Sequence, residues 1–212
     1  MESLKKTIDN FKSEVVSKAP AEIRAVMQRC TQDLKASGIE WSGLKAGDKM
    51  PDFQLPDQHG KLHRFYDYLK SAPVVLNVYR GGWCPYCNFE MKALSEALPA
   101  IRAKGALLVG MSPELPSKAE LTAKKNGIDM DILYDAGNAV SEKLGLVFEL
   151  PEALRPIYQQ FGIDLPAYNG DTSFRLPVPA TYIIEQNGDI RFAYINADYT
   201  ERMEPSDILA RL

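Results

Sequence analysis

Two cysteines lie where a buried strand is expected to give way to a helix. Residues 74–79 are mostly apolar and rich in β-branched side chains, and the run is too short for a helix, so it predicts a buried strand. Residues 88–104 have the composition and the apolar spacing of a helix. Cys84 and Cys87 stand between these segments, and Pro85 is favoured at the first position of a helix. The sequence therefore predicts a C-x-x-C motif at a strand-to-helix turn.

Strands and helices alternate around this motif. Further strands are predicted at residues 106–111, 132–134, 181–185 and 190–195, and further helices at residues 118–126, 138–144 and 152–160. A short strand and a turn are predicted within residues 47–61, and a loop is predicted from residue 161 to residue 179. Asn187 and Gly188 join the last two strands and are a strong hairpin signal. The pattern predicts an α/β domain with a central mixed sheet flanked by helices.

The first 44 residues form a separate predicted unit. Apolar side chains recur at helical spacing from Leu4 to Leu34, and Pro20 divides them into two helices. We divide the chain into an N-terminal helical arm, residues 1–44, and an α/β domain, residues 45–212. The apolar face of the arm must be covered by this domain or by a second copy of the chain, which leaves a homodimer open.

Charge and hydropathy exclude several classes of partner. The 212 residues include 25 Lys and Arg and 28 Asp and Glu, a net charge of −3 that argues against nucleic acid. No apolar run approaches the ~20 residues that cross a bilayer, and the first residues lack the apolar stretch of a secretion signal. We therefore expect a cytoplasmic protein with no membrane partner. Three cysteines in that compartment indicate redox or metal chemistry rather than structural disulfides.

The position of Cys84 favours a reactive thiolate. A helix that starts at Pro85 places Cys84 at the N-cap, where unpaired N–H groups and the helix dipole stabilise an anion. Cys87 lies one turn further into the helix, close enough to attack a sulfur intermediate on Cys84 and form a disulfide. We expect an exposed nucleophile at Cys84 and a sheltered resolving thiol at Cys87.

Zinc binding and inert packing of two thiols are the alternatives for this pair. A structural zinc site needs four ligands, and the remaining candidates are Cys30, His59 and His63. Cys30 lies on the apolar face of the arm and is expected to be buried there. The two histidines lie in a polar turn and are expected to face solvent. We therefore expect no metal.

The motif and the chain around it resemble known proteins. Residues 83–87 resemble the active site of thioredoxins and glutaredoxins, including the Pro-Tyr pair of glutaredoxins. The wider chain is similar to the alkyl hydroperoxide reductase/thiol-specific antioxidant (AhpC/TSA) family, the peroxiredoxin-like proteins. The similarity rests on residues 47–55, 74–84, 107–112, 133–145 and 180–194 and covers about residues 45–195. It implies a thioredoxin-like fold for the α/β domain.

The resemblance also implies an activity. The Cys84 thiolate would attack the O–O bond of hydrogen peroxide or an organic hydroperoxide, and Cys87 would resolve the sulfenic acid as a Cys84–Cys87 disulfide. Thioredoxin, glutaredoxin or glutathione would restore the dithiol, and no cofactor is needed. A thiol-disulfide oxidoreductase acting on protein or glutathione disulfides is the first alternative. A non-catalytic redox-sensing or binding module is the second.

The family likeness assigns further residues, and the chain departs from the family pattern at Asn77, at Gly81 and in the Pro179 region, where related families place an arginine. Trp83, Pro85, Tyr86 and Pro179 would form the surface for substrate or partner, and Pro179 matches the cis-proline of thioredoxins. Gly81 stands where peroxiredoxins carry a threonine that orients the peroxide, so that hydroxyl is missing.

Two charged features remain. Arg80 is a candidate stabiliser of the thiolate or of the peroxide, because a nearby cation lowers the pKa of a thiol; the alternative is a solvated loop charge. The polar residues 198–202 are expected to form a surface cap or salt bridge.

Overall fold

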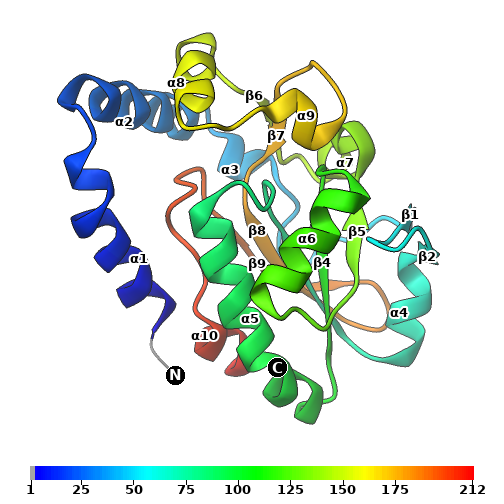
Figure 1. The fold of residues 1–212 in the computed structure, drawn as a ribbon. Coiled ribbons are helices and arrows are strands. Elements are labelled where there is room, and N and C mark those ends of the chain that lie inside the picture. Colours follow the sequence, from blue (N-terminus) through cyan, green and yellow to red (C-terminus); the bar gives the residue numbers. More distant parts are fainter. Residues whose placement is uncertain (1–2) are drawn as a thin grey trace.

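A five-stranded mixed sheet forms the centre of this computed structural model, which describes residues 3–212 (Figure 1). The strand order is β5-β4-β3-β8-β9; β3, β4 and β5 are parallel, and β8 is antiparallel to both of its neighbours. The strands are β3 (Val74–Val78), β4 (Leu107–Ser112), β5 (Ile132–Tyr134), β8 (Ala180–Ile184) and β9 (Ile190–Ile195). The predicted class, the mixed sheet and the closing hairpin are confirmed.

Strand β3 is covered on both faces. Every residue of β3 and of β8 is buried, which explains why these segments are apolar at successive positions instead of alternate ones. Asn77 is the polar exception in β3, and its Nδ2 donates to Thr181 Oγ1 of β8 at 3.4 Å. The chain leaves β3 at the carboxyl edge of the sheet and reaches the two cysteines within a few residues.

Helices cover the two faces of the sheet. On one face, α5, α6 and α10 pack with Val75 and Ile183 in one apolar cluster. On the other face, α4 and α7 pack with Leu76 and Tyr182 in a second cluster. The helices are α4 (Phe65–Ser71), α5 (Pro85–Ala103), α6 (Pro116–Asn126), α7 (Ala139–Lys143) and α10 (Pro205–Leu209). Among the described residues, no helix has the length and apolar character needed to cross a bilayer.

Short elements surround this core. The strands β1 (Gln54–Pro56) and β2 (Leu62–Arg64) form one antiparallel pair, and β6 (Val147–Glu149) and β7 (Arg175–Pro177) form another. The short helices are α3 (Ile39–Ser42), α8 (Arg155–Gln160) and α9 (Leu165–Asn169), and 3₁₀ turns lie at Val16–Lys18, Ala136–Asn138 and Glu152–Leu154. The prediction of an uninterrupted loop over residues 161–179 is wrong, because it contains α9 and β7. Elements of three to five residues are too short to show a period in the sequence.

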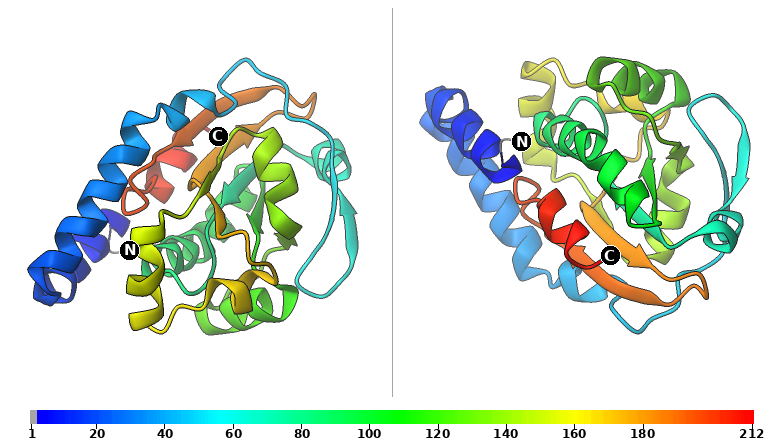
Figure 2. Two further views of the ribbon diagram at one scale, coloured as in Figure 1. Left: turned by 90° about the horizontal axis from the view of Figure 1, so that it is seen from above. Right: turned by 90° about the horizontal axis from the view of Figure 1, so that it is seen from below.

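The N-terminal helices α1 (Leu4–Glu14) and α2 (Ala21–Ala36) lie along one side of the molecule (Figure 2). Phe11 of α1 packs edge-on against Tyr86 of α5, with 5.6 Å between ring centroids. The Glu204 carboxylate accepts from the backbone N–H groups of Leu4 and Lys5 at the start of α1. The apolar face of α1 is thus covered by the same chain.

Helix α2 is attached through a third apolar cluster. Cys30 is buried there with Leu150, Leu154 and Ile157, so the prediction of a packed Cys30 is confirmed. Burial raises the pKa of the Cys30 thiol above its ordinary value.

Candidate active site

Cys84 is the N-cap residue of α5, and Pro85 is the first helical residue, as the sequence predicts. The prediction of an exposed Cys84 is wrong, because only 1% of its surface is accessible and Cys87 is fully buried. Both cysteines lie in the apolar cluster that also contains Tyr86, with Trp83 and Tyr199 packed against it. The side chains that bury Cys84 and Cys87 include ones distant in the sequence, and sequence spacing could not predict their contact with the motif.

The two thiols are free and hydrogen-bonded to each other. Burial by itself would raise the pKa of the Cys84 thiol. Hydrogen bonds from the Cys87 thiol and backbone N–H, together with the charges of Arg80 and Arg202, outweigh burial and lower this pKa to about 6. Burial, the hydrogen bond to Cys84 and the charge on Cys84 raise the pKa of Cys87 well above its ordinary value. The first cysteine is therefore a thiolate at neutral pH and the second a thiol.

Arg80 is fully buried beside these cysteines and is not a solvated loop charge. Its Nη2 donates to the Tyr158 hydroxyl, and its guanidinium carbon lies 4.8 Å from the Trp83 ring centroid and 4.5 Å from that of Tyr199. Its Nε and Nη1 have no hydrogen-bond partner among residues 3–212. Contact with the faces of aromatic rings stabilises the charge of a buried guanidinium. That charge favours the Cys84 thiolate.

A second buried guanidinium, that of Arg202, contacts Cys87, and the sequence did not predict this contact. Arg202 Nη2 donates to Cys87 Sγ at 3.4 Å, and its Nη1 lies 3.1 Å from Glu90 Oε2. The prediction that residues 198–202 form a surface feature is wrong for Arg202, whose side chain is 1% exposed. A usable signal was present: Glu90 is a carboxylate within the stripe of α5 that carries Cys87, Met91 and further buried side chains.

Polar contacts of Glu114 and Asn88 hold the turn before Cys84. Glu114 accepts from the Gly82 N–H at 2.8 Å and from the Tyr79 hydroxyl at 3.0 Å. Asn88 Nδ2 donates to the carbonyl oxygens of Gly82 and Cys84. These bonds fix the path from β3 to α5 and thereby the position of the nucleophile.

The backbone conformation and surroundings of Gly81 leave no room for the threonine that the family carries at this position. Its φ is +142°, and a Cβ there would lie 2.4 Å from Trp83 Nε1. A side chain would meet both backbone strain and the indole ring. In this turn no threonine hydroxyl is present, and the Trp83 side chain packs directly on the backbone at Gly81.

Replacing Gly81 with alanine is expected to destabilise the protein by about 1–3 kcal/mol and to move Trp83, because the alanine would need a strained backbone and a displaced indole. Urea unfolding and Trp83 emission measure the two effects.

Gly105→Ala is the matched control for this prediction. Gly105 also has a positive φ, +75°, but a Cβ there would meet no atom within 4 Å. Equal destabilisation by the two substitutions, with unchanged emission, would contradict a role for the Trp83 contact.

The predicted partner surface is only partly exposed. Trp83 and Pro85 are half-buried, so the expected partial exposure of Trp83 is confirmed, whereas Tyr86 and Pro179 are buried. The prediction of a surface role is therefore wrong for these two residues in this conformation.

The cis-proline prediction is also wrong, because residues 3–212 contain no cis peptide bond. The chain runs extended from β7 into β8. The Val178 N–H donates to the Leu146 carbonyl at 2.7 Å, and the Pro179 carbonyl accepts from the Asn196 N–H at 3.4 Å. A trans bond continues this extended path between the two strands.

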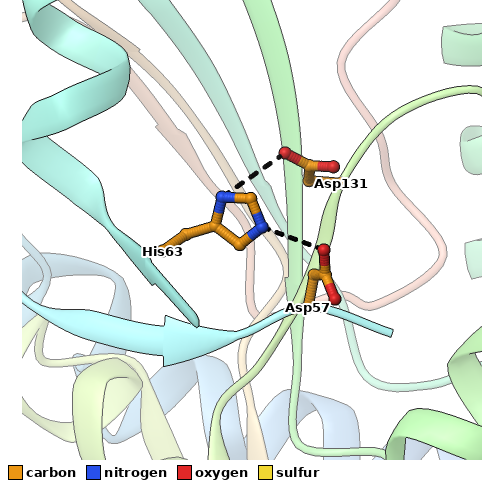
Figure 3. A group of neighbouring side chains, drawn as sticks. All are labelled: Asp57, His63 and Asp131. Atoms are coloured by element: carbon orange, nitrogen blue, oxygen red, sulfur yellow. Dashed lines mark hydrogen bonds and ion pairs between the residues drawn. The ribbon is translucent and has the colours of Figure 1, made fainter. Parts of the chain in front are cut away.

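Asp57, His63 and Asp131 each offer one possible ligand atom, and these three atoms lie within 4.8 Å of one another, near enough to share a metal ion (Figure 3). His63 Nε2 lies 2.9 Å from Asp57 Oδ2, and its Nδ1 lies 3.8 Å from Asp131 Oδ2. Asp57 also accepts from the backbone N–H of His59, and Asp131 from the Tyr68 hydroxyl. Both carboxylates therefore have hydrogen-bond partners within the protein. The two active-site cysteines are not part of this group.

The two histidines differ in exposure. The prediction of a solvent-facing side chain is wrong for His63, which the β1–β2 pair holds against Asp131 just before β5. It is confirmed for His59, which is exposed.

Known proteins with similar sequences include peroxiredoxins and a thiol-disulfide oxidoreductase. A sequence model of the AhpC/TSA family matches residues 46–193. The chain is 25% identical over 185 residues to peroxiredoxin Q, chloroplastic, of Triticum aestivum, covering 87% of this chain and 75% of that protein. It is 27% identical over 153 residues to the thiol-disulfide oxidoreductase ResA of Geobacillus kaustophilus, covering 72% of this chain and 70% of that protein. Matches to two other plant proteins named peroxiredoxin Q cover only 63% and 64% of their lengths.

The fold is similar to solved structures as well. The crystal structure of peroxidoxin BcpB from Mycobacterium tuberculosis matches with a TM-score of 0.62 and 23% sequence identity, covering 79% of this chain and 96% of that one. At this identity the likeness concerns the fold, which is the predicted thioredoxin-like one. The region of the family match contains both Cys84 and Cys87.

Proposed function

The chain belongs to the AhpC/TSA family, and on this premise we propose that it is a thiol-dependent peroxidase whose nucleophile is the Cys84 thiolate. The observation that carries the proposal is the state of Cys84. Its pKa is lowered to about 6 despite burial, by hydrogen bonds from Cys87 and by the charges of Arg80 and Arg202. A thiolate with a second thiol in contact can both attack a peroxide and be resolved.

The reaction proceeds in two steps. The Cys84 thiolate attacks one oxygen of the hydroperoxide, the O–O bond breaks, and the alcohol or water leaves with a proton from solvent. The resulting Cys84 sulfenic acid then condenses with Cys87, which forms the disulfide and releases water. Thioredoxin, glutaredoxin or glutathione, available in a reducing compartment such as the cytoplasm, returns the two electrons.

Arg80 has the chemistry to act on the first step. Its positive charge lies among aromatic rings beside Cys84, and two of its N–H-bearing nitrogens have no partner within residues 3–212. Such donors can stabilise the negative charge that develops on the peroxide oxygen as the O–O bond breaks.

The rate of the first step is expected to depend on ionisation of Cys84. The thiolate is the reactive form, so the second-order rate constant should be high above the pKa of about 6 and should fall about tenfold per pH unit below it. Arg80→Met removes a cation that favours the thiolate, so the midpoint should move upward by about one to two pH units. Stopped-flow mixing with hydrogen peroxide, followed by Trp83 fluorescence in a Trp41→Phe background, measures both quantities.

Arg102→Met is the control, since Arg102 is an exposed residue paired with Asp129. It should leave the midpoint unchanged. A wild-type midpoint between 8 and 9, or a rate no higher than that of a free thiol, would reject the peroxidase proposal and favour thiol-disulfide exchange, with glutathione disulfide as the next substrate to test.

A further inference from the structure

A buried ion pair lies directly against the resolving cysteine. Glu90 follows Cys87 by one turn on the same face of α5, and Arg202 comes from the segment after β9. Arg202 Nη1 lies 3.1 Å from Glu90 Oε2, while Nη2 of the same guanidinium donates to Cys87 Sγ at 3.4 Å. The guanidinium therefore connects the carboxylate with the sulfur.

Fold stability alone does not explain this pair. Removing two charges from water costs several kcal/mol per ion, and apolar replacements of buried ion pairs are often equally stable. Arg202 Nε also has no hydrogen-bond partner among the described residues, so the guanidinium is incompletely satisfied. What distinguishes the pair is its contact with a reacting atom.

We propose that Glu90 accepts the proton of Cys87, and that Arg202 holds the resulting thiolate, when Cys87 attacks the oxidised Cys84. The inference rests on the proposed peroxidase function. The S–H bond of Cys87 breaks and its proton passes to the Glu90 carboxylate. The Cys87 thiolate then forms the S–S bond to Cys84 as the S–O bond of the sulfenic acid breaks. The leaving hydroxide takes the proton from Glu90 and departs as water, so Glu90 returns to its starting state.

The guanidinium lowers the free-energy cost of this transfer. Before transfer, the negative charge is on Glu90 beside Nη1; afterwards it is on Cys87 beside Nη2, so the charge stays next to the same cation throughout. A proton acceptor works best when its pKa is near the operating pH. Burial raises the pKa of Glu90 to about 7, although the charge of Arg202 opposes the shift.

Oxidation of Cys84 prepares Cys87 for this step. Burial and contact with Cys84, including the charge on Cys84, raise the pKa of Cys87 in the dithiol form. A neutral sulfenic acid at Cys84 removes the charge, so Cys87 loses its proton more readily once peroxide has reacted. The charged and titratable groups facing Cys87 and Glu90 are Cys84, Arg80, Arg202, Tyr79, Glu114, Tyr158 and Tyr194, and Asn77 donates to Glu90.

Glu90→Gln separates the two chemical steps. The experiment mixes the reduced protein with one equivalent of hydrogen peroxide and follows the fast oxidation phase and the slower disulfide-forming phase. Dimedone quenching measures the sulfenic acid on Cys84. We expect the oxidation phase to remain fast and the disulfide phase to slow about a hundredfold, with sulfenic acid accumulating.

The pH profile distinguishes proton transfer from a structural role. In the wild type, the disulfide phase should speed up as pH rises through about 7, where Glu90 loses its proton. In Glu90→Gln this rise should be absent. Arg202→Lys keeps a positive charge but lacks the fixed pair of Nη donors, so it should slow the same phase. Glu185→Gln, which removes the carboxylate of the Glu185–Arg191 pair, is the matched control and should match the wild type.

The outcomes identify which proposal fails. A disulfide phase of Glu90→Gln with the wild-type rate and pH profile, after a fast oxidation phase, would overturn the roles of Glu90 and Arg202 alone. Absence of a fast oxidation phase in the wild type would instead reject the peroxidase function. A slowed phase that keeps the wild-type pH profile would also overturn the proton-acceptor role.

Discussion

Cys84→Ser is expected to lose peroxide reduction by at least about 10³-fold, because removing a nucleophile usually costs that much or more. A serine hydroxyl is not ionised near neutral pH. The Cys84 thiol, in contrast, has a pKa lowered to about 6 by Cys87, Arg80 and Arg202, although burial opposes this shift. Peroxide consumption with thioredoxin, thioredoxin reductase and NADPH present measures the loss.

Cys30→Ser is the matched control for this substitution. Cys30 is buried in the cluster between α2 and α8, and burial raises the pKa of its thiol, so it should be unreactive. The variant should therefore consume peroxide at the wild-type rate. If Cys84→Ser consumed peroxide as fast as the wild type, another group would be the nucleophile. If Cys84→Ser still bound a redox partner and the wild type showed no turnover, the chain would be a binding module.

Local sequence patterns were sufficient to predict the sheet and the motif. The predicted strand at residues 132–134 and the last predicted strand at residues 190–195 match β5 and β9, and the helix begins at Pro85 as expected. These features depend on neighbouring residues: mostly apolar side chains at successive positions of a buried strand, a proline at the first helical position and an Asn-Gly turn. An alternation of strand and helix then limits the fold to an α/β sheet.

The environment of the thiols could not be predicted in this way, since it is assembled from distant parts of the chain. Arg202 is 115 residues from Cys87, and Tyr158 is 78 residues from Arg80. The polar cluster after the last strand suggested a surface pair of Asp198 with Arg202 at i,i+4, so the sequence favoured that interpretation for Arg202. Arg202 is buried in an ion pair with Glu90, and no periodic pattern in the sequence predicts this contact. Burial of Cys84 was missed for the same reason.

Cys87→Ser is expected to stop turnover after a single oxidation and to leave sulfenic acid on Cys84. The first step should survive, because a serine hydroxyl can still donate the hydrogen bond that helps to lower the pKa of Cys84. The second step needs a thiol in contact, and Cys30 lies in a separate cluster under α2. We expect thioredoxin-coupled turnover to fall by at least about a hundredfold, and excess peroxide to convert Cys84 to sulfinic acid. Mass spectrometry detects both products.

Cys87→Ala tests whether the hydrogen bond itself matters for Cys84. Alanine cannot donate, so the pH midpoint of the first step should move upward from about 6, whereas in Cys87→Ser it should stay near the wild-type value. Equal midpoints in the two variants would assign the lowered pKa to the backbone N–H of residue 87 and to the charges of Arg80 and Arg202, with no contribution from the side chain. Normal turnover by the double variant Cys30→Ser/Cys87→Ser would mean that an external thiol such as glutathione resolves the sulfenic acid. Cys87 would then act only as a hydrogen-bond donor to Cys84. The buried Glu90–Arg202 pair would take no part in removing the Cys87 proton.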